Sequence, residues 1–280
     1  MSLRDQSVSL VCHRSILSLV IDPHSLVHMS TTSSYISELI NQNKDLWETG
    51  VTHQFMDDIC NDTLSIDRFR DFLSQIRFVS HEGIRGLLCR MLADTSDPNM
   101  VKNLTSHIQA LQSDGEHFTN VGESLKALGV TDPAQEEKMP AVEALCDYFF
   151  KIGVLGSTHE KLLAVTTFVE LSNARFEAAR KKGKVPNNPI TSKWFHDHSQ
   201  AVMNPWLHYL RTALDNSVAK GTTHPSSHSG HTDKMIFRRI IQWTILLCDS
   251  TTNRGIMEWP ESKFYHKAAM TEAAARVRGT

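Results

Sequence analysis

The sequence predicts an all-α protein built around one core. Apolar residues recur three and four positions apart almost everywhere after Ser33, which is the spacing of an amphipathic helix. No sustained alternation of apolar and polar residues marks a β-strand, and composition does not shift abruptly along the 280 residues. We therefore expect a single helical domain at residues 33–280, preceded by a poorly ordered extension at residues 1–32.

The first expected helices form one wall of the core. A helix is expected from Ser34 to Trp47, where apolar residues make a buried stripe. Ser65 is a suitable N-cap for a second, longer helix, because the apolar residues from Phe69 to Gly83 share one face. Between these helices, Asp57 and Asp58 are expected in a solvated turn.

The rest of the chain continues the same helical spacing. The segment 220–232 is rich in Gly, Ser, Thr and His, which predicts a flexible loop. Gly, Asp, Asn or Pro signals end the other helical segments. Helices are expected at 98–111, 116–128, 140–152, 159–181, 192–218, 233–247 and 262–277.

The charge balance and the cysteines limit the classes of partner. With 29 basic and 31 acidic residues, the net charge is -2, so no basic surface for nucleic acid is expected. The five cysteines are widely spaced, odd in number and never in a CxxC pair, which argues against a disulfide framework and a zinc site. No run reaches the roughly 18 apolar residues of a membrane span. A cytoplasmic protein with a small-molecule partner is expected.

No metal or cofactor is expected either. Asp57-Asp58-Ile59-Cys60-Asn61 resembles the DDxxD motif of terpene cyclases, but the second magnesium motif of those enzymes is incomplete. His81-Glu82 and His196-Asp197-His198 place potential ligands one or two positions apart, where side chains on a helix diverge. GxSxG, HExxH, P-loop and GxGxxG motifs are also missing from the sequence.

One set of segments is more specific. The chain reads Lys44-Asp45-Leu46-Trp47-Glu48, then His53-Gln54-Phe55, Asp62-Thr63-Leu64-Ser65 and Phe69-Arg70-Asp71-Phe72-Leu73-Ser74-Gln75. This pattern resembles the opening of the TenA family, the thiaminase II or aminopyrimidine aminohydrolase proteins. The resemblance implies a heme-oxygenase-like multi-helix bundle with a central buried pocket, assembled as a homodimer or homotetramer.

The resemblance also locates the family's catalytic positions, which are altered in this chain. The family's aspartate after the glutamine falls on Ile76, which follows Gln75. Its cysteine nucleophile falls on Thr167, and its late glutamate falls on Gln242. His198 takes a tyrosine position. A threonine hydroxyl without a nearby base is a very weak nucleophile, so the parent hydrolysis is not expected.

Apolar residues take further pocket positions of the family. Val79, Leu145 and Leu171 fall where the family has aromatic residues, and Thr166 is a less certain match to the nucleophile than its neighbour. Trp243 lies in a helical stripe and is expected either in the core or as an aromatic wall of the pocket. We expect Ile76, Val79, Leu145, Leu171 and Trp243 to bind the ligand.

These substitutions predict a repurposed TenA-like enzyme acting on a mainly apolar small molecule by cyclisation, isomerisation or rearrangement. His198 is the expected acid or base, Gln75 and Gln242 are expected to polarise a carbonyl, and Thr167 completes the expected catalytic set. Two alternatives stay open. One is a non-catalytic binding or scaffold protein, and the other is a thiamine-salvage hydrolase using displaced residues such as Cys146 or Glu170.

Overall fold

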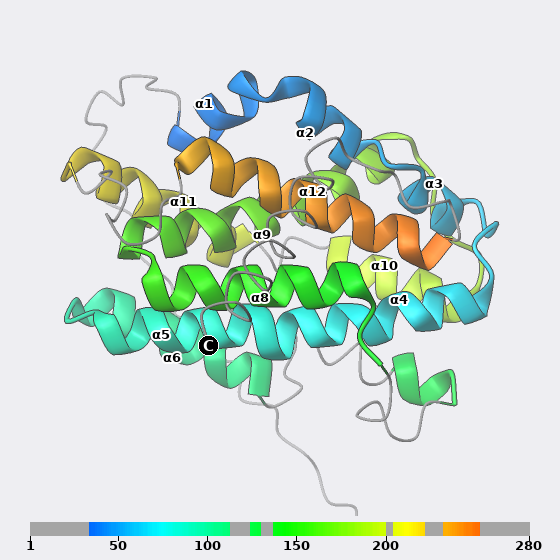
Figure 1. Cartoon of the computed structure of the whole chain (residues 1–280). Coiled ribbons are helices and arrows are strands. Elements are labelled where there is room, and N and C mark those ends of the chain that lie inside the picture. The colour runs from blue at the N-terminus through cyan, green and yellow to red at the C-terminus, as the bar shows by residue number, and fades with distance from the viewer. Residues whose placement is uncertain (1–33, 113–123, 130–136, 200–203, 222–231, 253–280) are drawn as a thin grey trace, which may run out of the picture. The chain divides into compact units, whose positions relative to one another are not determined.

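A computed structural model describes residues 34–112, 124–129, 137–199, 204–221 and 232–252. These residues all belong to one compact unit, Ser34–Thr280. Within the described ranges every regular element is a helix, so the all-α prediction is confirmed (Figure 1). The expected extension at 1–32, most of the loop at 220–232 and the expected helix at 262–277 lie outside the described residues.

The N-terminal region has three short helices where we expected one helix and a turn. These are α1 (Tyr35–Gln42), α2 (Lys44–Val51) and α3 (Gln54–Cys60). Asn43 interrupts the first expected helix, because its φ of -129° and ψ of 35° leave the helical region while its side-chain amide donates to Leu39 O at 2.8 Å. The solvated turn expected at Asp57 and Asp58 was wrong, since both residues lie within α3.

The next three elements form one continuous rod. They are α4 (Ile66–Phe78), the π-helix η1 (Val79–Ile84) and α5 (Arg85–Asp94). Ser65 caps α4 as expected, since its Oγ accepts a hydrogen bond from Arg68 N at 3.4 Å. The π-helix was not predicted from the sequence. A π turn holds more residues than an α turn, so it changes which side chains of the rod share a face.

The remaining helices complete the bundle. The helix expected at 192–218 is in fact two helices, α10 and α11, separated by residues 200–203, which lie outside the described ranges. A capping box begins α9, in which Ser157 Oγ accepts from Glu160 N and Glu160 Oε2 accepts from Ser157 N. The elements are α6 (Pro98–Gln112), α8 (Pro140–Leu155), α9 (Thr158–Lys181), α10 (Pro189–Ser199), α11 (Asn204–Ala219) and α12 (Asp233–Thr252).

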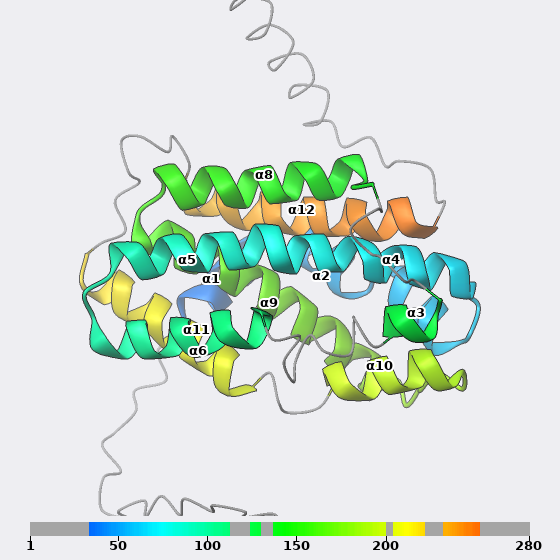
Figure 2. The ribbon, with the colours of Figure 1, turned by 90° about the horizontal axis from the view of Figure 1, so that it is seen from below.

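Helix α9 is the centre of this arrangement. It contacts α2, α3, α5, α8, α10, α11 and α12, and nearly all of its residues from His159 to Leu171 are buried. The rod α4–η1–α5 runs beside α8, and α12 packs against both α8 and α9 (Figure 2). Helices α3 and α10 lie near the α4 end of the rod in both views. Among the described helices, none has the length and apolar character needed to cross a membrane.

Candidate functional site

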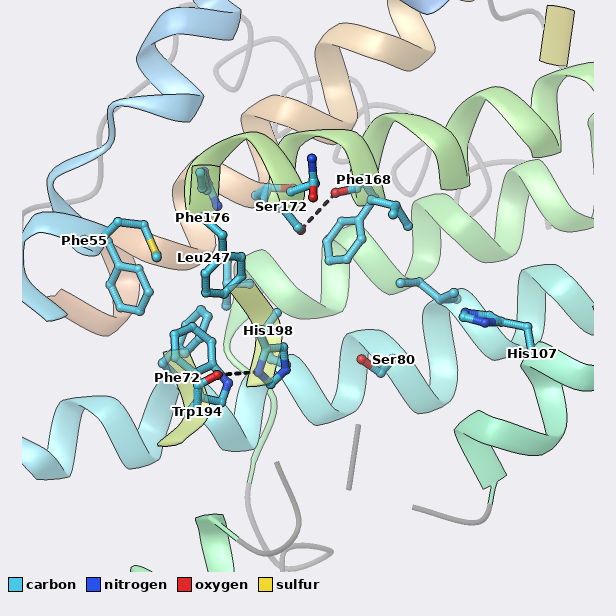
Figure 3. Close-up of a pocket in the computed structure, with 17 residues that line it drawn as sticks. Phe55, Phe72, Ser80, His107, Phe168, Ser172, Phe176, Trp194, His198 and Leu247 are labelled. Carbon is cyan, nitrogen blue, oxygen red and sulfur yellow. Dashed lines mark hydrogen bonds between the residues drawn. The ribbon is translucent and has the colours of Figure 1, made fainter. Parts of the chain in front are cut away.

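A cavity of about 100 Å³ lies among these helices. Its wall is mainly apolar, and four phenylalanines and a tryptophan contribute to it, so we call it the aromatic cavity (Figure 3). The lining residues are Phe55 and Met56 of α3, Phe72 and Ile76 of α4, Ser80 and Ile84 of η1, His107 of α6, Phe168, Val169, Ser172, Asn173, Arg175 and Phe176 of α9, Trp194 and His198 of α10, and Thr244 and Leu247 of α12.

Aromatic contacts fix one end of the cavity. The Trp194 ring meets Phe72 edge-on with centroids 5.9 Å apart, and its centroid lies 5.2 Å from that of Phe176. Phe55 packs on the other side of Phe72 at 4.3 Å. Edge contacts of this kind hold aromatic rings in defined orientations. The helices α3, α4, α9 and α10 are thereby joined through one aromatic cluster.

The π-helix decides which residues of the rod face the cavity. Phe72, Ile76, Ser80 and Ile84 all line it, and they are four residues apart. In an α-helix each step of four overshoots a full turn by about 40°, so a row of this length would rotate away from one face. The wider π turn counteracts this drift. Ser80 therefore faces the cavity at the position where the resemblance placed Val79.

The expected apolar wall is only partly in place. Ile76 lines the cavity, whereas Val79, Leu145 and Leu171 are buried elsewhere in the core. Leu171 faces α2, because a Cβ built on Gly50 would lie 3.0 Å from Leu171 Cδ1. Helix α8, which carries Leu145, contributes no lining residue and packs against η1 and α12.

Of the polar residues expected at the site, only some line the cavity. His198 lines the cavity, but Gln75, Thr167 and Gln242 do not. The Gln75 amide instead holds the segment before α8, since Nε2 donates to Glu137 O at 3.0 Å and Oε1 accepts from Met139 N at 2.8 Å.

The expected residues of α9 and α12 lie beside residues that line the cavity. Thr167 Oγ1 donates to Leu163 O of its own helix, whereas the next residue, Phe168, faces the cavity. On α12 the lining residues are Thr244 and Leu247, and the expected Trp243 packs on the core from a partly exposed position. Adjacent residues on a helix point about 100° apart, so an offset of one residue moves a side chain out of the site.

His198 is the histidine expected to transfer a proton. Its Nδ1 donates to Trp194 O at 2.8 Å, because a carbonyl can only accept. In the neutral ring, Nε2 therefore carries the lone pair. The imidazole stacks on Phe176 with an interplanar angle of 19° and lies 4.9 Å from the Trp194 ring (Figure 3).

Two of the three lining hydroxyls, those of Ser172 and Thr244, are turned back toward their own helices. Ser172 Oγ donates to Phe168 O at 2.9 Å, and Thr244 Oγ1 donates to Ile240 O at 2.6 Å. Such i to i−4 bonds satisfy the hydroxyl within the helix. These residues therefore present little hydrogen-bonding capacity to a ligand.

Arg175 is the lining residue that the sequence analysis missed. It is only 7% exposed, yet it carries a guanidinium into a mostly apolar wall. Nε donates to Gly50 O at 2.7 Å and Nη1 donates to Cys248 Sγ at 3.4 Å. The signal in the sequence was a lone basic residue within the buried stripe of α9, next to Phe176.

The two displaced candidates for hydrolysis lie away from the aromatic cavity. Cys146 is buried on α8, and its Sγ lies 3.8 Å from Phe78 O, to which it donates. Burial raises the pKa of its thiol to about 11. Glu170 is buried and forms a two-pronged ion pair with Arg211. Over the residues that the structure describes, no three His, Cys, Asp or Glu side chains gather as a metal site requires.

The described residues form an all-helical bundle with an internal apolar cavity, and comparisons with known proteins identify the family that shares this fold. The sequence profile of the TENA/THI-4/PQQC family matches residues 40–229. The chain therefore belongs to this family, and the predicted resemblance is confirmed. A comparison with curated protein sequences found no significant match.

Solved structures agree on the fold. A TenA homologue from Pyrococcus furiosus aligns with a TM-score of 0.66 at 15% identity, over 77% of this chain and 98% of that one. A TenA homologue from P. horikoshii aligns with a TM-score of 0.65 at 17% identity, over 80% of this chain and all of that one. A domain with a heme oxygenase-like fold from Shewanella denitrificans gives 0.53 at 13% identity, over 85% and 96% of the two chains. The predicted heme-oxygenase-like bundle is confirmed.

Proposed function

We propose that this chain is a TenA-family enzyme that converts a small, mainly apolar molecule by isomerisation, cyclisation or rearrangement, without thiaminase chemistry. The observation that carries the proposal is the aromatic cavity, whose walls are mostly apolar and which is lined by two histidines, His107 and His198. The imidazole of His198 has a defined tautomer. An apolar pocket with few polar groups is typical of small-molecule sites.

The size of the cavity limits the substrate. An engineered cavity of about 150 Å³ is enough for benzene, so about 100 Å³ suits a molecule of a few non-hydrogen atoms. A larger substrate requires the ring of Phe168 or Phe176 to change rotamer. The proposed substrate is therefore compact.

His198 is the proposed proton-transfer group. The bond from Nδ1 to Trp194 O orients the ring and leaves the Nε2 lone pair as the base in the neutral form. An isomerisation needs one group that takes a proton from carbon and returns it at another carbon, and an imidazole can do both near neutral pH. Ser80 supplies a hydroxyl to the same cavity.

The test is incubation of the full chain with a small-molecule extract of the encoding organism, followed by untargeted mass spectrometry. We expect one compound to be replaced by a product of the same mass, and the rate to fall by about 100-fold or more in His198→Gln. His196→Gln, two residues away and outside the cavity, is the matched control and should leave the rate unchanged. Conversion unaffected by His198→Gln would exclude the proposed role, and a bound but unconverted compound would favour the non-catalytic alternative.

A second incubation addresses the thiamine-salvage alternative. Thiamine and its aminopyrimidine should both remain intact, because Cys146 and Glu170 do not line the aromatic cavity. Hydrolysis that is abolished in Cys146→Ala would overturn the proposal.

Assembly as a homodimer or homotetramer belongs to the same proposal. Phe150 and Val154 of α8 are 56% and 54% exposed, and an i, i+4 pair of apolar residues on one helix face is a suitable contact between copies. Light scattering coupled to size-exclusion chromatography should give two or four times the chain mass of 31.6 kDa. A mass of one chain would refute this part.

A further inference from the structure

We propose that the ligand of the aromatic cavity is an apolar acid whose carboxylate binds Arg175. This inference rests on the proposed function to the extent that it takes the aromatic cavity as the ligand site. It adds the chemical class of the ligand, which the apolar wall and His198 do not specify.

The guanidinium of Arg175 is only partly satisfied by the protein. Nε and Nη1 donate to Gly50 O and to Cys248 Sγ, but the buried Nη2 meets no acceptor among the described residues. A guanidinium has five N–H donors and no acceptor. Arg175 lines the cavity, and its Nη2 group keeps unused donors.

The positive charge of Arg175 is also without a counter-charge at ion-pair distance. No carboxylate of the described part of the chain forms an ion pair with it. Its sulfur partner, Cys248, does not supply a negative charge. Burial raises the pKa of the Cys248 thiol despite the opposing effect of Arg175, so the thiol stays protonated and neutral. The adjacent carboxylate, Asp249, is hydrogen-bonded to His53 Nε2 at 3.1 Å.

Lys161, the other buried Lys or Arg side chain among the described residues, has a counter-charge, because it pairs with Asp94. Arg211 is partly exposed and still pairs with the buried Glu170 through both Nε and Nη2. Burying a charge without a partner is costly. The exception lies at a cavity wall, which indicates that the missing partner of Arg175 is a ligand.

A second unsatisfied donor lines the same cavity. Trp194 Nε1 is buried and has no acceptor in the described residues. Both groups can only donate, so the matching ligand group must accept hydrogen bonds and carry negative charge. A carboxylate does both and pairs well with a guanidinium. A phosphate dianion is disfavoured, because Arg175 is the one Lys or Arg side chain in the lining.

The experiment is isothermal titration calorimetry of the full chain with two pairs of isosteres. The acids are propanoate and 2-methylpropanoate, and their neutral matches are propanamide and 2-methylpropanamide, which are small enough for a cavity of about 100 Å³. Wild type should bind each acid at least about tenfold more tightly than its amide, because only the acid pairs with the guanidinium. Arg175→Gln should remove this preference, and Arg175→Lys should keep part of it.

The matched control is Arg211→Gln. It removes the guanidinium that pairs with Glu170, and Arg211 does not line the cavity, so this variant should retain the preference for acids. If wild type binds acids and amides equally, the inference fails while the aromatic cavity remains a ligand site. If wild type binds neither pair, and xenon, a small apolar probe, does not bind the cavity either, the proposed function fails with it. The wild-type comparison needs no substitution, so it decides even if Arg175→Gln does not fold.

Discussion

Cys146 and Cys89 differ in the property that governs thiol chemistry, which is access to water. Cys89 is exposed, whereas Cys146 is buried and its pKa is raised to about 11. At pH 8 only about 0.1% of a thiol with this pKa is thiolate, the reactive form. We expect iodoacetamide to label Cys89 at least about tenfold faster, as measured by peptide mass spectrometry.

The pH dependence provides the check on that prediction. Labelling of Cys146 in the folded chain should keep rising with pH through pH 9 and 10, because its thiolate fraction is far from saturation below pH 11. Labelling in urea should remove the difference between the two cysteines. Equal rates in the folded state would show that the thiol of Cys146 is not shielded.

Single residues also show how far the sequence predicted the site. Ile76 and His198, which the family resemblance named as site residues, both line the cavity. Thr167 was one residue away from the lining residue Phe168, and Arg175 was missed. Spacing shows that a helix is buried, but all sides of α9 are buried, so spacing did not reveal which side meets the cavity.

At the scale of elements, the π-helix η1 packs closely on α8. A Cβ built on Gly83 would lie 2.9 Å from Phe149 Cδ2, within the core. We expect Gly83→Ala to lower the free energy of unfolding by about 1 to 3 kcal/mol, since overpacking outweighs the better helix propensity of alanine. Urea unfolding followed by circular dichroism measures this difference.

The control for that substitution lies one turn further along the rod. A Cβ on Gly86 would meet only the flexible Arg90 guanidinium, at 3.3 Å. Gly86→Ala should therefore be neutral or stabilising by up to about 1 kcal/mol. Similar losses in the two variants would mean that contact with Phe149 is not what requires glycine at position 83.

The element boundaries show a second limit of the sequence. The expected long helices were correct where apolar spacing ran unbroken, as in α8, α9 and α12. The break between α1 and α2 was missed because no Gly or Pro marks it in the sequence. There the Asn43 side chain, in place of a backbone N–H, donates to the Leu39 carbonyl. The π turn was missed for another reason. A constant period of 3.6 residues per turn predicts an α-helix throughout and does not reveal a wider turn.

At the scale of the whole bundle, a partly buried polar network joins four helices. Asp233 of α12 accepts hydrogen bonds from Tyr35 of α1 and from His159 Nε2 of α9, and His159 Nδ1 lies 2.7 Å from Ser217 Oγ of α11. Burial acts to raise the pKa of Asp233, but the bonds from His159 and Tyr35 outweigh it and lower that pKa below its usual value. The network ties both ends of the described chain to the central helix.

This network makes the stability of the fold depend on pH, and the stability should fall as the pH is lowered. Since the folded pKa of Asp233 is lowered, its contribution is complete above the unfolded value of about 3.9 and is lost as pH falls through the folded pKa. At pH 7, Asp233→Asn should lower the free energy of unfolding by on the order of 3 kcal/mol, because it breaks a buried pair. Urea titrations from pH 7 down to pH 3 measure the difference from wild type.

The difference should narrow only below about pH 4, where the Asp233 carboxylate of the unfolded chain begins to be protonated while that of the folded chain is still charged. Asp197→Asn, which breaks the pair between Asp197 and Lys193 on α10, is the control and should cost less than about 1 kcal/mol at every pH. A difference for Asp233→Asn that stays constant from pH 7 to pH 3 would contradict the assigned role of the charge.

The π-helix has a consequence for how this cavity can diverge. A π turn holds one residue more than an α turn, so deleting one codon within residues 79–84 would restore ordinary α geometry and leave α5 almost unturned relative to α4. Ile76 and Ile84 would both stay on the cavity wall, and the change would be confined to the residues between them. Chain length in this stretch therefore determines which side chain of η1, at present Ser80, meets the cavity, and an insertion or deletion can change it without disturbing the helices on either side.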